Sequence, residues 1–359
     1  MTFSRRSKAV LAGGVIAALA LLSVGFFALF PDRAPAFVRT AMAGVGLTQD
    51  PPPPPDCPLT GRPAPGGAIA VAPGGAIPDR PVLAIKVENL PEARPQTGLD
   101  RADVVYEEPV EGGITRFIAV YQCREAPRVG PVRSGRTTDA AVLVQYGHPA
   151  LGYAGAAPIV ERTIDRAGII DVNYDVAVDA YTRDANRPAP HNLYTSTKAL
   201  WKAAKTKEGA PDPVFSYAVE LTGRSKKVAT VHLPFSSYSD VYWKWSRKDR
   251  AWLRFHGTEP HMLTDGRQVS AADVVVMQVQ VTPGTIVDAA GNPSPEVKLT
   301  GSGRAYVFRD GRMIVGRWER ASLDDPTAFV ARDGTEIALA PGTTWVELLP
   351  STIPVQTQK

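Results

Sequence analysis

The sequence is poor in cysteine and histidine. It contains two cysteines, Cys57 and Cys123, and five histidines in 359 residues. The cysteines do not form a C-x-x-C pair and the histidines lack the spacing of metal ligands, which argues against a zinc site. We therefore expect neither a metal nor a cofactor.

A strong excess of one charge sign is also lacking. Forty Lys and Arg face 36 Asp and Glu, which gives a formal net charge of +4. A small excess spread along the chain does not favour a nucleic-acid-binding protein, in which a concentrated basic face is expected. At 44% hydrophobic and 21% charged residues, the composition excludes a wholly disordered, collagen-like or multi-pass membrane protein.

Common catalytic motifs are absent as well. The sequence has no G-x-S-x-G, no P-loop and no H-E-x-x-H. Serine hydrolase, NTPase and zincin mechanisms therefore have no support.

The most apolar part of the chain lies near its N-terminus. Residues 9–30 carry no charge and follow Arg5, Arg6 and Lys8. A helix of this length can cross a hydrocarbon core of about 30 Å, and the basic flank places its N-terminus in the cytoplasm. We predict a single-pass plasma-membrane protein with its bulk outside the cytoplasm. The alternative is a secreted protein, cleaved at the small residues 41–43.

Composition changes predict five parts of the chain. Pro51–Pro55 can only form extended polyproline II, which makes a stiff spacer. After that spacer, a polar segment around 210–227 separates two regions with different hydrophobic patterns. The predicted parts are a transmembrane signal-anchor (1–30), a Pro-rich tether (31–56), two domains (57–222 and 223–350) and a tail (351–359).

The two domains differ in their expected secondary structure. In the first, strands are expected at 81–88, 102–107 and 114–122, and helices at 137–146, 158–167 and 195–205. After about residue 228, short alternating runs separated by turns predict an all-β domain, sandwich or barrel-like. The predicted fold class is α+β: a mixed α/β domain followed by an all-β domain.

Five arginines lie within 21 residues, with Glu125 as the acidic residue among them. They are Arg116, Arg124, Arg128, Arg133 and Arg136. Arg133, Ser134 and Arg136 stand just before a predicted helix, where free N–H groups and guanidinium forks can bind a carboxylate or phosphate. The alternative is ion pairing with the nearby acids, which are Glu107, Glu108, Glu111 and Asp139.

A proline-rich loop carries a second polar cluster. Arg187, His191 and Asn192 lie in or beside the segment Pro188–Pro190. His191 could bind a ligand or transfer protons, because a histidine titrates near neutral pH, or it could be a hydrogen-bonded structural residue. We predict that this loop and the Arg133 loop, together with Arg116, form one anion-binding site.

Three acids are candidates for proton transfer, namely Glu107, Glu111 and Asp139. Glu107 and Glu111 stand at a strand end and the following turn, where paired carboxylates could hydrolyse glycosides. Salt bridges to the arginines are the plainer interpretation. No catalytic residue can be assigned from these patterns.

Both cysteines lie in the part of the chain expected to be exported, where oxidation is permitted. We predict a disulfide between Cys57 and Cys123, which would tie the entry segment of the first domain to a buried strand. Two unpaired thiols are the alternative.

Several longer motifs occur in a fixed order. They are residues 94–99 (RPQTGL), 102–107 (ADVVYE), 110–116 (VEGGITR), 130–134 (GPVRS), 190–194 (PHNLY), 301–308 (GSGRAYVF) and 341–345 (PGTTW). Together they resemble the YerB-like family of bacterial envelope proteins, a domain of unknown function with a separate C-terminal domain. The resemblance covers about 59–350 and implies an exported two-domain protein, without a demonstrated activity. No cysteine follows the apolar run directly, so this chain departs from the lipoprotein label of its relatives.

Two functions remain open. The first is a membrane-anchored envelope protein that binds an anionic cell-wall polymer or precursor through its arginine-rich loop, with the C-terminal domain as a docking module. The second is an envelope enzyme acting on lipid-linked or polymeric phosphate substrates of cell-wall assembly. The lack of a nucleophile–base motif favours the first function. The sequence names no protein partner.

Overall fold

The computed structural model describes residues 56–64, 76–288 and 290–359. The predicted anchor over 1–30 and the tether up to residue 55 lie outside these ranges. Within them, no helix is both long and apolar enough to cross a membrane.

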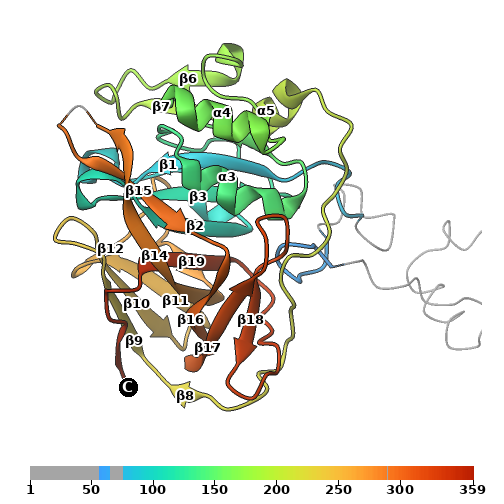
Figure 1. Cartoon of the computed structure of the whole chain (residues 1–359), viewed down its shortest axis with the longest axis vertical. Coiled ribbons are helices and arrows are strands. Elements are labelled where there is room, and N and C mark those ends of the chain that lie inside the picture. Colours follow the sequence, from blue (N-terminus) through green and yellow to red (C-terminus); the bar gives the residue numbers. More distant parts are fainter. Residues whose placement is uncertain (1–55, 65–75, 289) are drawn as a thin grey trace, which may run out of the picture. The chain divides into compact units, whose positions relative to one another are not determined.

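A twelve-stranded sheet forms the centre of the fold (Figure 1). Its main path runs β18-β17-β16-β14-β19-β2-β3-β1-β4-β5, with β15 and β8 paired at the side. The strands are β1 (Leu83–Glu88), β2 (Val104–Pro109), β3 (Thr115–Tyr121), β4 (Ala150–Gly152), β5 (Ile170–Asp171), β8 (Lys226–Lys227), β14 (Asp273–Val287), β15 (Pro293–Lys298), β16 (Gly301–Arg309), β17 (Arg312–Arg320), β18 (Ala328–Ala331) and β19 (Thr344–Pro350). The central strands β1 and β3 are buried along their whole length, as their apolar runs predict.

Strand β19 joins the two halves of the chain. It runs parallel to β14 on one side and parallel to β2 on the other, so that Thr344 lies between Asp273 and Val104. The sheet therefore contains strands from both sides of the predicted boundary at residue 222. The boundary itself stays a prediction.

A smaller sheet covers one face of the large one. Its order is β12-β11-β10-β9-β20, with β13 paired to β11. The strands are β9 (Thr230–Pro234), β10 (Asp240–Ser246), β11 (Ala251–His256), β12 (Glu259–Pro260), β13 (Ser270–Ala271) and β20 (Gln356–Gln358). Alternate residues such as Val231, Trp243 and Trp252 are buried in one core with Trp345 of β19. The described residues after 225 contain strands and no helix, in line with the all-β prediction for this region.

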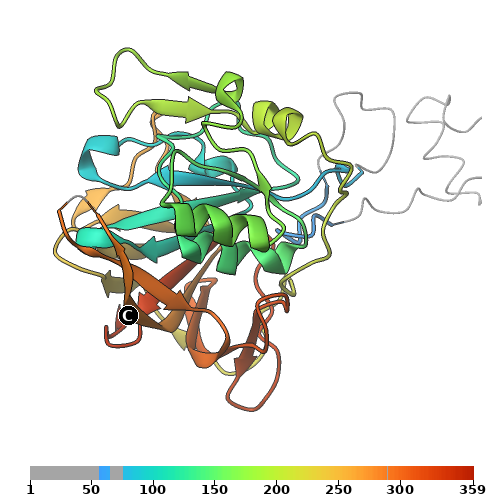
Figure 2. The same cartoon turned by 45° about the horizontal axis from the view of Figure 1, so that its top comes forward.

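Within the described residues, three α-helices precede residue 205, namely α3 (Thr137–Leu143), α4 (Pro158–Arg166) and α5 (Thr197–Ala204). Helices α3 and α4 lie side by side over one face of the large sheet (Figure 2). Helix α5 and the hairpin of β6 (Tyr181–Arg183) and β7 (Leu193–Thr195) pack into the core on the other face of the large sheet. Each helix begins within two residues of its predicted start. Ser196 caps α5 by accepting the N–H of Ala199 at 3.1 Å.

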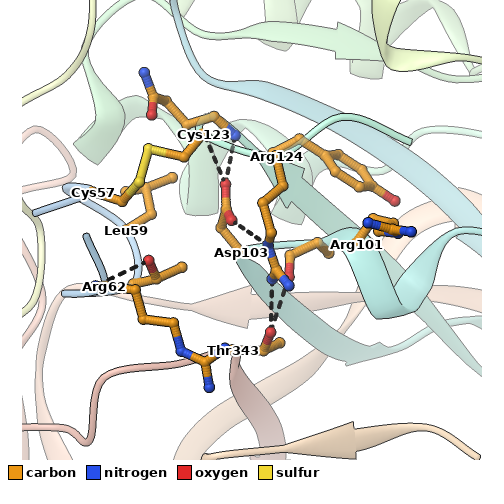
Figure 3. A network of polar contacts seen from close by, with 12 residues as sticks. Cys57, Leu59, Arg62, Arg101, Asp103, Cys123, Arg124 and Thr343 are labelled. Carbon is orange, nitrogen blue, oxygen red and sulfur yellow. Dashed lines mark hydrogen bonds and ion pairs between the residues drawn. A yellow bond between two sulfur atoms is a disulfide. The ribbon is translucent and has the colours of Figure 1, made fainter. Parts of the chain in front are cut away.

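The predicted disulfide is confirmed: Cys57 and Cys123 are bonded, with their Cα atoms 6.1 Å apart. Beside it, the buried carboxylate of Asp103 accepts the backbone N–H of Cys123 at 3.1 Å and Nε of Arg124 at 3.0 Å (Figure 3). Arg124 Nη2 donates to Thr343 Oγ1 at 2.7 Å, just before β19. Arg124 therefore ties β2 and β3 to the C-terminal part of the chain.

Candidate anion site

Charged side chains collect at one end of β1, β2 and β3, on the face that α3 covers. Successive residues of a strand point to opposite faces, so Lys86 and Glu88 of β1 share this face with Glu108 of β2 and Arg116 of β3. Further along the same face the side chains are apolar and form the core under α3 and α4.

Lys86 forms the floor of this group. It has no exposed surface, and its Nζ donates to Glu108 and, at 2.5 Å, to Asp139 Oδ1. Burial lowers the pKa of Lys86 to about 8, against the opposing effect of the Asp139 charge. The other oxygen of Asp139 accepts the N–H of Arg136 at 2.7 Å and so begins α3. The predicted proton-transfer candidate Asp139 is therefore engaged in two structural contacts.

The two predicted loops meet on one carboxylate, that of Glu88. Arg133 Nε lies 3.0 Å from Glu88 Oε1, and His191 Nδ1 lies 2.9 Å from Oε2. Backbone hydrogen bonds set this arrangement, because Arg133 N donates to Lys86 O and Val132 N donates to Leu193 O. Glu88 is 1% exposed, whereas the side chains of Arg133 and His191 are 27% and 15% exposed. The side chains of Arg133 and His191 thus form a rim above a buried acid.

Arg136 pairs with Glu111 through both ends of its fork, at 2.7 and 2.6 Å. Burial acts to raise the pKa of Glu111, but the hydrogen bonds and charge of Arg136 outweigh it and hold the pKa below its ordinary value. Strand β15 covers this pair: Thr137 Oγ1 donates to Glu296 Oε2 at 2.9 Å. The site is therefore built from both halves of the chain.

Arg116 differs from its neighbours because it has no acidic partner. It is 6% exposed, and Nη1 donates to the carbonyl of Ser134 at 3.1 Å. Its Nε has no hydrogen-bond partner, and no carboxylate of the described residues lies within 4.0 Å of its guanidinium. Burial, followed by the charge of Arg136, lowers the pKa of Arg116 to about 9. Such a buried and unmatched cation is unusual in a folded protein.

The N-terminus of α3 contributes less to anion binding than the sequence pattern predicts. Helix α3 is seven residues long, and the N–H of Arg136, its capping residue, is already bonded by Asp139. The capacity to hold an anion therefore rests on the arginines.

Two residues of the predicted site shape the loop that presents His191. Arg187 donates to the carbonyls of Glu92, Arg94 and Pro95 and to the hydroxyl of Tyr194. Asn192 accepts from Arg183 at 2.9 Å and donates to the carbonyls at both ends of the turn. A direct contact of either residue with a ligand stays a prediction.

Glu107 lies on the opposite face of the sheet from Glu111. It accepts Arg254 Nη2 at 2.6 Å and Thr115 Oγ1 at 2.6 Å, and all three residues are buried. Nearby, burial and the charge of Glu107 raise the pKa of Glu347 well above its ordinary value. The structure therefore separates Glu107 from the group around Glu88 and gives it a role in joining β11 to the large sheet.

The group also contains residues that the sequence patterns do not predict as part of the site, namely Lys86, Glu88 and Glu296. A usable signal was present for the first two, because charges at i and i+2 of an otherwise apolar strand must share one buried face. In the described ranges, no group of three or more His, Cys, Asp or Glu side chains is placed to hold a metal ion.

The chain matches the models of a known protein family. Residues 68–210 match the N-terminal domain, and residues 231–346 the C-terminal domain, described as "Protein of unknown function (DUF3048)". The Bacillus subtilis (strain 168) protein named "Putative lipoprotein YerB" is 26% identical over 287 residues, which cover 76% of this chain and 82% of that protein. The crystal structure of YerB from Bacillus subtilis has a TM-score of 0.69 at 23% identity, covering 84% of this chain and 99% of that one. The structural match shows a shared fold.

Proposed function

The chain belongs to the DUF3048 family, and from this premise we propose that it is an exported cell-envelope protein that binds an anionic ligand at Arg116. The name of the Bacillus relative, a lipoprotein, supports an envelope location, as does the predicted anchor over 1–30. The observation that carries the binding proposal is the buried guanidinium of Arg116 without an acidic partner.

The energetic argument concerns desolvation. Removing a cation from water without a partner is unfavourable by several kcal/mol, and proteins normally match such a group with an acid. The charges of Glu111 and Glu88 act to raise the pKa of Arg116, but both acids are in direct contact with other arginines, Arg136 and Arg133. No carboxylate of the described residues therefore contacts Arg116 directly. A carboxylate or phosphate from a ligand would give the Nε–H of Arg116 the acceptor that it lacks.

The rim explains how such a ligand would be held. Arg133 and His191 are partly exposed beside Arg116, so an incoming anion would meet their N–H groups first. Arginine forks bind carboxylate and phosphate oxygens at two points, which favours these groups over a simple halide. Taken with the proposed envelope location, this preference points to an anionic cell-wall polymer or precursor as the ligand class.

The same contacts favour binding over catalysis. A general base needs an oxygen or nitrogen free to take a proton from the substrate. Each acid of the group, namely Glu88, Glu108, Glu111 and Asp139, contacts a cation in the described structure, and Glu107 lies on the other face. The carboxylate oxygens without a hydrogen-bond partner, Glu88 Oε1 and Glu108 Oε2, are buried. Turnover of lipid-linked or polymeric phosphates, the enzymatic alternative, is therefore the less favoured function.

The test uses the full-length chain in detergent solution. Isothermal titration calorimetry should detect binding of anionic cell-wall precursors and polymers, and no binding of the same compounds after methyl esterification or dephosphorylation. Mass spectrometry of the recovered ligand should show it unchanged. Equal binding of charged and neutral forms would contradict the proposal, and a hydrolysed or transferred product would favour the enzyme.

A further inference from the structure

A groove of about 940 Å³ runs along the outer edge of β17, between β8 and β18. These three strands belong to the C-terminal half of the chain and lie at the edge of the large sheet (Figure 1). The groove is lined by backbone and side chains of Arg224, Lys226, Arg312, Ile314, Val315 and Arg332, among others. None of these residues belongs to the candidate anion site.

Strand pairing is interrupted at this groove. Strand β8 pairs with Arg312 and Met313 of β17, and β18 pairs with 316–319. On that side, no strand of the described residues pairs with Ile314 or Val315. An open stretch of strand edge presents backbone N–H and C=O groups that another extended chain can bind. Because the gap is two residues long, it can accept the end of a peptide rather than a long strand.

The groove carries unmatched positive charge. Its four cations, Arg224, Lys226, Arg312 and Arg332, have no carboxylate of the described residues within 4.0 Å of their charged groups. Arg312 is held in place because Nε donates to Ser225 Oγ at 2.8 Å and Nη2 to Ser225 O at 3.2 Å. The acid in the lining, Asp333, accepts the N–H and hydroxyl of Thr335; these hydrogen bonds and, less strongly, the charge of Arg224 lower the pKa of Asp333. With four cations and one acid, the lining keeps a net positive charge.

We propose that this groove binds the carboxyl-terminal end of a short peptide. The last two residues would pair with Ile314 and Val315, and the terminal carboxylate would lie among the four cations. The end of a peptide has a backbone that can pair with the open strand edge and a carboxylate that can contact the cations. A phosphate polymer would match the charge alone. Residues 1–55 and 65–75 of this chain carry Asp32 and Asp50 as their acids, so they complement the groove poorly.

The binding experiment uses fluorescence anisotropy with the full-length chain in detergent solution. The probes are tetrapeptides of Ala, Val and Leu, labelled at the N-terminus and ending in a free carboxylate. We expect saturable binding that weakens at least tenfold when the terminal carboxylate is replaced by an amide. Methylation of the last two peptide nitrogens should weaken it to a similar extent, because it blocks strand pairing.

Variants locate the site. Arg224→Gln with Arg332→Gln should weaken peptide binding at least tenfold, since both side chains are exposed and their loss leaves the fold intact. The matched control, Arg247→Gln with Lys248→Gln on the exposed turn after β10, should bind as the unmodified chain does. Arg116→Gln should also leave peptide binding unchanged, which separates this proposal from the function proposed above.

Three results would overturn the proposal. One is the absence of binding by every carboxylate-ended peptide, and another is equal binding of the amide or methylated forms. The third is full displacement of the peptide by inorganic phosphate at the peptide's own concentration, which would identify a general anion site. The peptide comparisons use the unmodified chain, so they decide the question even if a variant fails to fold.

Discussion

At the residue scale, the candidate site is a set of matched charges with one exception. Lys86, Arg133 and Arg136 each contact at least one carboxylate, whereas Arg116 donates only to a backbone carbonyl. The exception matters because a buried guanidinium keeps its proton and all of its N–H donors, which require hydrogen-bond acceptors. Two predictions follow from neighbours of Arg116 that serve different roles.

Arg133→Lys should weaken anion binding although the charge is kept. The ammonium group can occupy one position of the fork but cannot offer two parallel N–H donors, and the loss of one charge-assisted hydrogen bond corresponds to roughly tenfold in affinity. The free energy of unfolding should change little, because Arg133 is partly exposed. Calorimetric titration beside urea denaturation checks both statements. Unchanged affinity would remove Arg133 from the site.

Lys86→Met should destabilise the fold strongly. The change leaves Glu108 and Asp139 facing each other in the interior without their shared cation. Removal of one partner from a buried ion pair typically lowers the free energy of unfolding by about 3–5 kcal/mol. Urea denaturation measures this, and a loss below about 1 kcal/mol would show that Lys86 does not hold these acids in place.

At the element scale, the sequence was informative where local signals are strong. The apolar runs located β1, β2 and β3, and the residues around Ser196 located α5. The apolar run at 274–281 is shorter than β14, which continues to Val287; the second half of this strand is largely exposed and contains Pro283, so the apolar pattern does not reveal it. Strand β15 was missed altogether, since Pro293 and Pro295 are not typical of strands. The β14–β15 hairpin supplies Glu296 to the site, so this part of the site's cover could not be predicted.

The first residue of β14 should make the stability of the fold depend on pH. Asp273 is buried and accepts the N–H of Ala340 at 2.9 Å. Burial raises the pKa of Asp273 from 3.8 to about 8, so the folded chain keeps a proton that the unfolded chain releases above about pH 4. The contribution of Asp273 to the free energy of unfolding is therefore full below about pH 4 and declines as the pH rises to about 8.

Asp273→Asn isolates this contribution, because the amide keeps the acceptor and cannot ionise. Urea denaturation measures the free energy of unfolding of both proteins at each pH. The value for the variant minus that for the unmodified chain should be larger at pH 8.5 than at pH 5. If the difference in stability between the two proteins were the same at both pH values, the buried carboxyl would not be protonated in the folded state.

At the scale of the whole molecule, contacts between residues far apart in the sequence determine the strand order and the assembly of the site, and local sequence patterns do not reveal them. Local patterns placed a boundary near residue 222, yet β19 lies between β2 and β14 in one sheet. Nothing in residues 344–350 alone indicates which strands they will join. Likewise, the motifs predicted that Arg133 and His191 share a site, but their common contact, Glu88, became visible only in three dimensions.

The disulfide should stabilise the whole compact part of the chain. It closes a loop across a sequence separation of 66 residues. The chain-entropy estimate for such a loop is about 4 kcal/mol. Cys57→Ser with Cys123→Ser should lower the free energy of unfolding by about this amount, and a reducing agent should then have no further effect. A reduced chain as stable as the oxidised one would contradict this role.

The proposed function requires that Arg116 binds a ligand and is not a structural residue. Its most direct test compares Arg116→Gln with Arg320→Gln, measuring anion affinity by calorimetry and stability by urea denaturation on the same samples. Arg320 is equally buried, but it donates to three backbone carbonyls, those of Ala141, Leu323 and Asp325. We predict that Arg116→Gln loses at least tenfold in affinity and keeps or gains stability, while Arg320→Gln loses stability and keeps its affinity. Full anion affinity in Arg116→Gln, together with a loss of stability like that of Arg320→Gln, would show that Arg116 is structural and would contradict the account.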